Sequence, residues 1–170
     1  MKRLLLFLAS ASMLMANSQP ANKEIILAQF TRTQGEWDGF VEYTDFTDNV
    51  TKFALPAKCT TRFDGKVWTY DVQYDEGNGE IVTGVGECVL NEDGSKMDNN
   101  GIIWNVSDVI QSGDTVKVVM QTTGKDNRKK ATLQQTLFVT STTFQLIEEV
   151  KYLDSQVFFV RNKHLFRKKK

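Results

Sequence analysis

The fold is decided by a short stretch early in the chain, GEWDGFVEY, residues 35–43. Its residues alternate in the way typical of a strand with one buried face. The alternation places Trp37, Gly39 and Val41 on one face, and Tyr43 continues it. We expect this face to point into the protein interior. Because Gly39 has no side chain, a neighbouring strand can approach the sheet closely beside Trp37.

The chain beyond this stretch continues as a series of short strands. Segments rich in Val, Thr and aromatic residues alternate, and turn signals such as Asp64-Gly65, Ser112-Gly113 and Asp154-Ser155 divide them. Two-residue loops that end in glycine fit type I′ turns, whose twist matches that of paired strands. The pattern therefore predicts a meander of about eight to ten strands, each joined tightly to the next.

A meander of this kind must protect its two edges. Closing the sheet into a barrel removes both edges at once. The alternative is a two-sheet sandwich, which usually contains longer Greek-key crossings, and the sequence shows no such crossing. Residues 22–34 have helical spacing at Ile25, Ile26, Ala28 and Phe30. We therefore predict an all-β, single antiparallel up-and-down barrel with a short N-terminal helix or turn that plugs one end.

The first 18 residues have the layout of a secretory signal. Lys2 and Arg3 are followed by a mostly apolar run from Leu4 to Ala16 and then by small and polar residues. This run is too short for a membrane span, which needs about 20 apolar residues, although a buried N-terminal helix is the alternative. We expect signal cleavage and export to the periplasm or the exterior, without stable membrane insertion.

The charge balance indicates no nucleic-acid partner. The chain has 21 basic and 21 acidic residues, whereas a nucleic-acid-binding domain carries a basic patch on a basic background. The basic cluster at residues 167–170 is interpreted as a solvated terminus rather than a membrane-surface patch. The predicted organisation is a signal at 1–18, a lead segment at 19–34, a barrel at 35–167 and a basic tail at 168–170.

The Gly-x-Trp motif at Gly35 and Trp37, at the mouth of the first strand, resembles the calycin superfamily and its lipocalins. The resemblance covers most of residues 35–167, and GEWDGFVEYTDF together with FFVRNKHLFRK is similar to an exported bacterial lipocalin-like group without an assigned activity. It implies that Trp37 packs at the barrel base against an arginine of the last strand. Arg161 and Arg167 are the candidates, and strand direction favours Arg167 at the base and Arg161 near the cavity.

Hairpin pairing around Asp154-Ser155 predicts an interior charge pair. A two-residue loop there places Val150 opposite Phe159 and Glu148 opposite Arg161, with Phe144 on the same inward face. The predicted Glu148–Arg161 pair either binds the polar end of a ligand or is a structural pair satisfied within the barrel.

The same argument at Asp64-Gly65 places Trp68, Tyr70 and Tyr74 in the interior, as ligand contacts or as core. A small barrel has room for filling side chains or for one small ligand. The sequence therefore favours a barrel that binds a small hydrophobic or amphipathic molecule. The predicted ligand-binding residues are Tyr43, Trp68, Tyr70, Tyr74, Phe144, Glu148, Phe159 and Arg161, and the predicted structural residues are Trp37, Gly39 and Arg167. The alternatives are an isomerase or lyase that uses Glu148 and Arg161, and a filled structural barrel.

Metal and cofactor signals are weak. Cys59 and Cys88 suggest a disulfide in an exported chain. However, one strand lies between the two strands that carry them, and two strand spacings of about 9–10 Å exceed the Cα separation that a disulfide can bridge. His164 is predicted to point outward, opposite Gln145. Some haem-binding ten-stranded barrels take a histidine from the final strand, but an exposed histidine is the expectation here. We predict no metal site and no cofactor.

Overall fold

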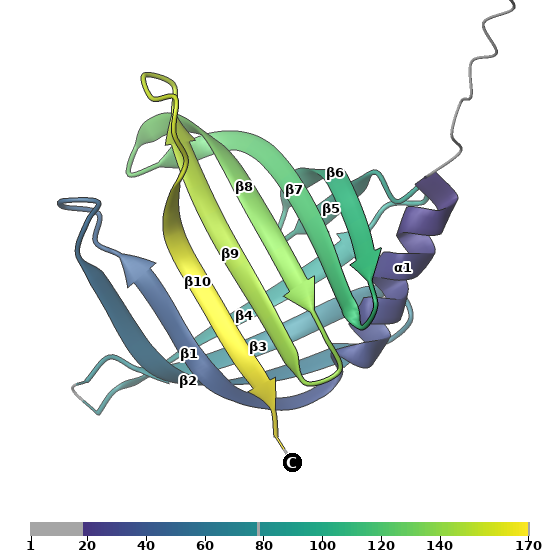
Figure 1. The fold of residues 1–170 in the computed structure, drawn as a ribbon. Helices are drawn as coiled ribbons and strands as arrows, with labels where there is room; N and C mark the ends of the chain where they lie inside the picture. Colours follow the sequence, from purple (N-terminus) through teal and green to yellow (C-terminus); the bar gives the residue numbers. More distant parts are fainter. Residues whose placement is uncertain (1–18, 78, 170) are drawn as a thin grey trace, which may run out of the picture.

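A computed structural model of the chain describes residues 19–77 and 79–169. The predicted secretory signal lies outside the described residues. The described part contains one helix and ten strands, shown in Figure 1. Their bounds are α1 Gln19–Arg32, β1 Gly35–Thr44, β2 Lys52–Phe63, β3 Val67–Asp75, β4 Ile81–Leu90, β5 Lys96–Asn99, β6 Ile102–Ser112, β7 Thr115–Asp126, β8 Lys129–Val139, β9 Thr143–Tyr152 and β10 Phe159–Lys168. Within this part, no helix has the length and apolar character needed to cross a bilayer.

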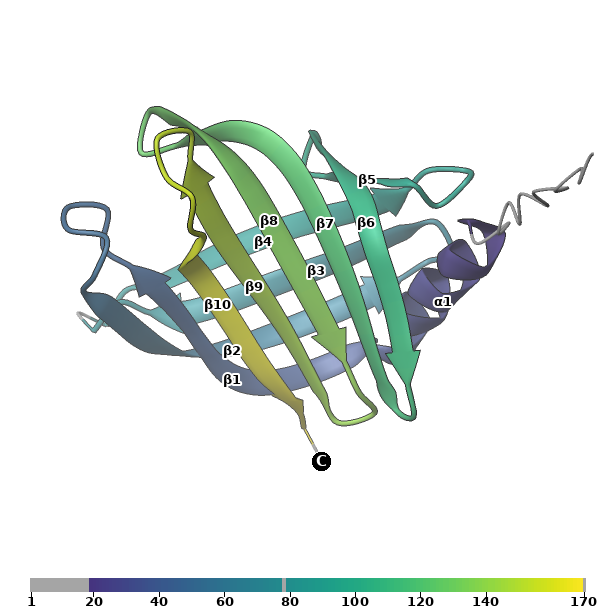
Figure 2. The ribbon, with the colours of Figure 1, turned by 45° about the horizontal axis from the view of Figure 1, so that its top comes forward.

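The ten strands form a closed antiparallel barrel. Each strand pairs with its neighbours in the chain, and β10 pairs back onto β1, from Trp37 with Lys168 to Tyr43 with Asn162. This closure leaves no free sheet edge. The prediction of a single up-and-down, calycin-like barrel with a short N-terminal helix is therefore confirmed, as Figures 1 and 2 show.

Helix α1 lies against one end of the barrel (Figures 1 and 2). Its residues Ile26 and Phe30 are buried in the core. The Phe30 ring stacks on the indole of Trp68 with a centroid separation of 5.2 Å. Arg32, in the last turn, forms an ion pair with Asp114 in the β6–β7 turn. The helix therefore plugs this end of the barrel, as its apolar spacing predicted.

Trp37 occupies the interior position expected from GEWDGFVEY. Its side chain is buried, and its indole nitrogen donates hydrogen bonds to the Thr33 carbonyl at 2.9 Å and to Thr61 Oγ1 at 3.2 Å. Two residues on, a Cβ added to Gly39 would lie 2.0 Å from the carbonyl oxygen of Leu165. Gly39 is therefore the point where β10 can approach β1 closely.

A β-bulge at Arg161 changes the predicted register of the last hairpin. Val150 lies opposite Phe159 as expected, but the pairing shifts between Val160 and Asn162, so that Glu148 lies opposite Asn162. The predicted Glu148–Arg161 pair is therefore wrong. A bulge inserts one unpaired residue, and every later side chain on the strand changes face.

The bulge also corrects the predicted partner of Trp37. Arg167 lies opposite Asp38 and is exposed, so it does not stack on the indole. The neighbouring Lys168 lies opposite Trp37 instead, with its ammonium nitrogen 5.5 Å from the ring centroid. The basic partner at the base of the barrel is thus a lysine one residue further along the strand.

The register of the β2–β3 hairpin differs from the predicted one, but the same side chains point inward. Trp68 lies opposite Phe63 and Tyr70 opposite Thr61, a shift of two residues from a two-residue loop. The carboxylate of Asp64 accepts hydrogen bonds from the backbone amides of residues 66 and 67, at 2.8 and 2.7 Å, and stabilises the longer turn. Because side chains alternate with a period of two, the inward residues are unchanged.

Candidate functional site

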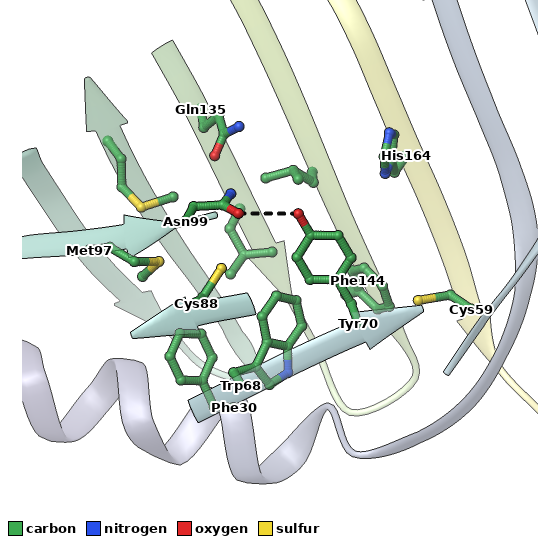
Figure 3. A pocket seen from close by; sticks show the side chains of 13 residues that line it. Phe30, Cys59, Trp68, Tyr70, Cys88, Met97, Asn99, Gln135, Phe144 and His164 are labelled. Atoms are coloured by element: carbon green, nitrogen blue, oxygen red, sulfur yellow. Dashed lines mark hydrogen bonds between the residues drawn. The ribbon is translucent and has the colours of Figure 1, made fainter. Parts of the chain in front are cut away.

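The candidate site is an interior cavity near the helix-covered end of the barrel, shown in Figure 3. Its lining comes from α1 and from eight of the ten strands, and most of it is aromatic, aliphatic or sulfur-containing. The lining residues are Phe30, Cys59, Trp68, Tyr70, Cys88, Met97, Asn99, Met120, Gln135, Leu137, Phe144, Leu146 and His164.

The cavity is tightly packed. The space open to the centre of a water molecule is about 20 Å³. This is far below the roughly 150 Å³ of an engineered apolar cavity that binds benzene. The ring of Trp68 lies 5.3 Å from Tyr70 and 6.5 Å from Phe144, centroid to centroid, and these three rings form one wall. A ligand of benzene size or larger therefore requires side chains to move.

His164 lies inside the barrel, which corrects the prediction that it points outward. The bulge at Arg161 places it opposite Leu146 rather than Gln145, and its ring lines the cavity. Burial disfavours the imidazolium and lowers the pKa of His164 to about 4, so the ring is neutral at pH 7. Among residues 19–77 and 79–169, no hydrogen-bond partner is found for this imidazole, which faces Phe166 edge-on at 6.3 Å.

Gln135 is a polar residue of the lining that was not predicted from the sequence. Its side chain is 6% exposed, and its amide nitrogen donates to Glu148 Oε2 at 3.0 Å. Its amide oxygen is buried and has no partner among the described residues. A buried acceptor without a hydrogen bond costs about 1–3 kcal/mol. The available signal was the pair Gln134-Gln135 in an alternating strand, because one of two adjacent glutamines must point inward.

Tyr70 and Asn99 form a second polar contact in the cavity wall. The tyrosine hydroxyl donates to Asn99 Oδ1 at 3.2 Å, drawn as the dashed line in Figure 3. The Tyr70 ring lies over Gly86, where an added Cβ would come within 1.9 Å of Cζ. Gly86 therefore creates the space for this ring. Burial raises the pKa of Tyr70 to about 12, so the phenol stays protonated.

The two cysteines line the cavity as free thiols. Cys59 on β2 and Cys88 on β4 are both buried and are not bonded to each other, in agreement with the intervening strand. Burial raises the pKa of each thiol to about 12, which keeps both protonated and unreactive at pH 7. In the described part of the chain, no group of three His, Cys, Asp or Glu residues is placed to hold a metal ion.

Arg161 lies outside the cavity, in a network formed with the connections at the other end of the barrel. It is 1% exposed and binds Asp126 through two bonds, Nε to Oδ1 at 3.0 Å and Nη2 to Oδ2 at 2.6 Å. It also donates to the Thr44 carbonyl at 2.9 Å and to Asn49 Oδ1 at 2.7 Å. Tyr152 completes the network by donating its hydroxyl to Asp126. Arg161 therefore joins the β1–β2 loop to β7 and β9.

This network leaves the isomerase or lyase alternative without its proposed residue pair. Glu148 accepts from Gln135, and the side chain of Arg161 is fully engaged with Asp126 and the β1–β2 loop. No ion pair joins Glu148 and Arg161 in the residues that the structure describes. The two residues are not arranged as a base and an anion-stabilising group.

The structure divides the residues predicted from sequence to bind a ligand. Trp68, Tyr70 and Phe144 line the cavity. Tyr43 stacks instead on Phe53, with ring centroids 5.2 Å apart.

Tyr74, Glu148, Phe159 and Arg161 also lie outside the cavity lining. Tyr74 contributes to a separate groove with Ile81. Phe159 packs against Tyr152, with ring centroids 5.7 Å apart. A ligand role for any of these residues stays a prediction.

Comparisons with known proteins support the fold. No protein-family model and no curated protein sequence matches the chain. Rv2717c from M. tuberculosis is similar in structure, with a TM-score of 0.59 at 12% identity over 85% of this chain and 97% of the other. The S-type phycobiliprotein lyase CPES from Guillardia theta gives 0.58 at 12% identity over 89% and 97%. The chain therefore has the lipocalin-like barrel fold that its Gly-x-Trp motif indicated.

Proposed function

We propose that the protein binds a small, mostly apolar ligand in the interior of its barrel. The observation that carries this proposal is the amide oxygen of Gln135, which is buried without a partner in a mostly apolar cavity. Binding sites for small molecules commonly combine apolar walls with a few placed polar groups. Trp68, Tyr70 and Phe144 supply such a wall here.

Ligand entry requires the cavity to expand. The space open to the centre of a water molecule is about 20 Å³, whereas a benzene-sized guest needs a cavity of about 150 Å³. Met97 and Met120 both line the cavity, and a methionine side chain is unbranched and adapts to irregular space. We propose that these two side chains move when a ligand enters.

The tight packing also favours a second candidate, a filled structural barrel whose cavity holds nothing larger than water. Native mass spectrometry of the protein purified from its own host separates the two. Ligand binding predicts a reproducible additional mass that is lost on denaturation. A bare chain mass, together with no change in melting temperature across a panel of small apolar compounds, would support the filled barrel.

We further propose that residues 1–18 direct export to the periplasm or the exterior. The basic head and apolar run of this segment support the proposal. Expression of the full chain, fractionation and N-terminal sequencing of the product test it. A charge in the apolar run, as in Leu6→Arg, should retain the uncleaved chain in the cell. Full-length protein in the cytoplasm for both chains would reject the proposal.

A further inference from the structure

We propose that the cavity selects neutral ligands that carry one N–H or O–H donor on an apolar body, of which phenol is the simplest aromatic example. This inference rests on the proposed function and names the chemical class of its ligand. It separates such molecules from two others of similar size, a hydrocarbon without the donor and a carboxylate.

The first step of the argument is the fixed orientation of the Gln135 amide. Its nitrogen donates to a carboxylate oxygen of Glu148 at 3.0 Å. The Glu148 oxygen is the acceptor in this bond, so the nitrogen of Gln135 faces Glu148 and the oxygen faces away. That oxygen is buried, has no described partner and belongs to a residue of the cavity lining (Figure 3). The site therefore presents an acceptor that a donor on a ligand can satisfy.

The second step is that another polar contact in the lining is already formed. Tyr70 uses its hydroxyl proton in the bond to Asn99 Oδ1. In Figure 3, Gln135 lies on the side of the cavity away from the helix, and Trp68 and Phe30 lie on the side next to the helix. A ligand whose donor meets Gln135 would thus place its apolar part towards rings and thioethers. This arrangement of one hydrogen-bond acceptor and an apolar wall fits a molecule with one polar end.

The third step concerns charge. The titratable groups that line the cavity are His164, Tyr70, Cys59 and Cys88, and burial keeps each of them uncharged at pH 7. A buried carboxylate needs a cationic or multiply donating partner to offset its lost hydration. The buried guanidinium of Arg161 is outside the lining and is already paired. A ligand carboxylate would therefore find no counter-charge here.

The experiment compares phenol, toluene and benzoate on the purified protein. The probes are titrated while the ¹³C-methyl signals of the methionines are followed by NMR, because Met97 and Met120 line the cavity. Phenol should bind at least about tenfold more tightly than toluene, since toluene leaves the acceptor unsatisfied. Benzoate should cause no saturable shift.

Two variants on the same strand provide the matched comparison. Gln135→Leu should remove the preference for phenol over toluene. Gln134→Leu should keep this preference, because Gln134 does not line the cavity. It is a matched control, because the neighbouring Gln134 makes the same kind of bond as Gln135, to Glu149 Oε2 at 2.8 Å. If Gln135→Leu does not fold, Gln135→Met, which also lacks the acceptor, replaces it.

The outcomes separate the inference from the proposed function. Equal binding of phenol and toluene, or a phenol preference that survives in Gln135→Leu, overturns the inference and leaves a binding barrel. An ordered water on the Gln135 oxygen that phenol does not displace also overturns it. If neither phenol nor toluene binds and no ligand mass co-purifies with the protein, the proposed function fails as well.

Discussion

Truncation of Arg161 tests the network at the end of the barrel opposite α1. In Arg161→Ala, the carboxylate of Asp126, itself 8% exposed, loses a partner that binds both of its oxygens. Removing one member of a buried ion pair costs about 3–5 kcal/mol, because the remaining charge is left without compensation. The Thr44 carbonyl also loses its donor at 2.9 Å, which places the expected loss in the upper half of that range.

Equilibrium urea unfolding at pH 7, followed by tryptophan fluorescence, measures this loss. With a denaturant dependence of about 2 kcal/mol per molar urea, a loss of about 4 kcal/mol lowers the midpoint by about 2 M. Arg167→Ala is the matched control, since Arg167 lies on the same strand and is exposed. Its effect should stay within about 0.5 kcal/mol.

Two further variants identify the partner of Arg161. Arg161→Met combined with Asp126→Leu should recover much of the lost stability, because no unpaired charge remains inside. Glu148→Gln should be mild, because Glu148 does not pair with the arginine. A midpoint shift below about 0.5 M for Arg161→Ala, or a loss on Glu148→Gln as large as that of Arg161→Ala, would refute the assignment.

Three other predictions concern the close strand contact and the buried titratable groups. Gly39→Ala should lower the free energy of unfolding in urea by about 1–3 kcal/mol, because the added Cβ would lie 2.0 Å from the Leu165 carbonyl oxygen. Gly84→Ala is the control and should be nearly neutral, because no atom lies within 4 Å of the added Cβ. Equal effects of the two substitutions would contradict the close approach of β10 to β1. The pKa of His164 is about 4 in the folded protein and about 6.5 in the unfolded chain, so the free energy of unfolding should fall by up to about 3 kcal/mol as the pH falls from about 6.5 to 4. This pH-dependent loss should be absent in His164→Leu. A titration midpoint near 6.5 for His164 in the folded protein, measured by NMR, would disprove its burial. The thiols of Cys59 and Cys88 should react with a thiol reagent only after unfolding, so rapid labelling of the native protein would contradict their protonated, buried state.

The sequence was sufficient to predict the architecture because a strand-register error of two residues leaves each side chain on the same face of the sheet. The β2–β3 hairpin pairs two residues away from its expected register, and yet Trp68 and Tyr70 still point inward. A shift of two residues returns each side chain to the same face. The short turns between successive strands then left closure into a barrel as the simplest way to protect the edges.

The sequence was not sufficient for the last strand, where the shift is one residue. Arg161 forms the bulge and binds Asp126, which lies 35 residues earlier in the chain. No local pattern around Arg161 reveals that partner. The single-residue shift moves His164 inward and Arg167 outward, so both predictions failed for the same reason.

Within the candidate site, the alternation of side chains predicted the aromatic wall of the cavity. The hydrogen bonding of the polar residues in that wall depends on contacts between strands. The alternating pattern placed Trp68, Tyr70 and Phe144 inside. It could not show that Glu148 holds the nitrogen of Gln135 and leaves the oxygen free, because this depends on the register between β8 and β9. The sequence by itself thus determined which face of most strands is buried, since that needs only a period of two. Tertiary structure alone decided the bulge at Arg161 and the unpaired oxygen of Gln135, because both arise from contacts between strands rather than from any local signal.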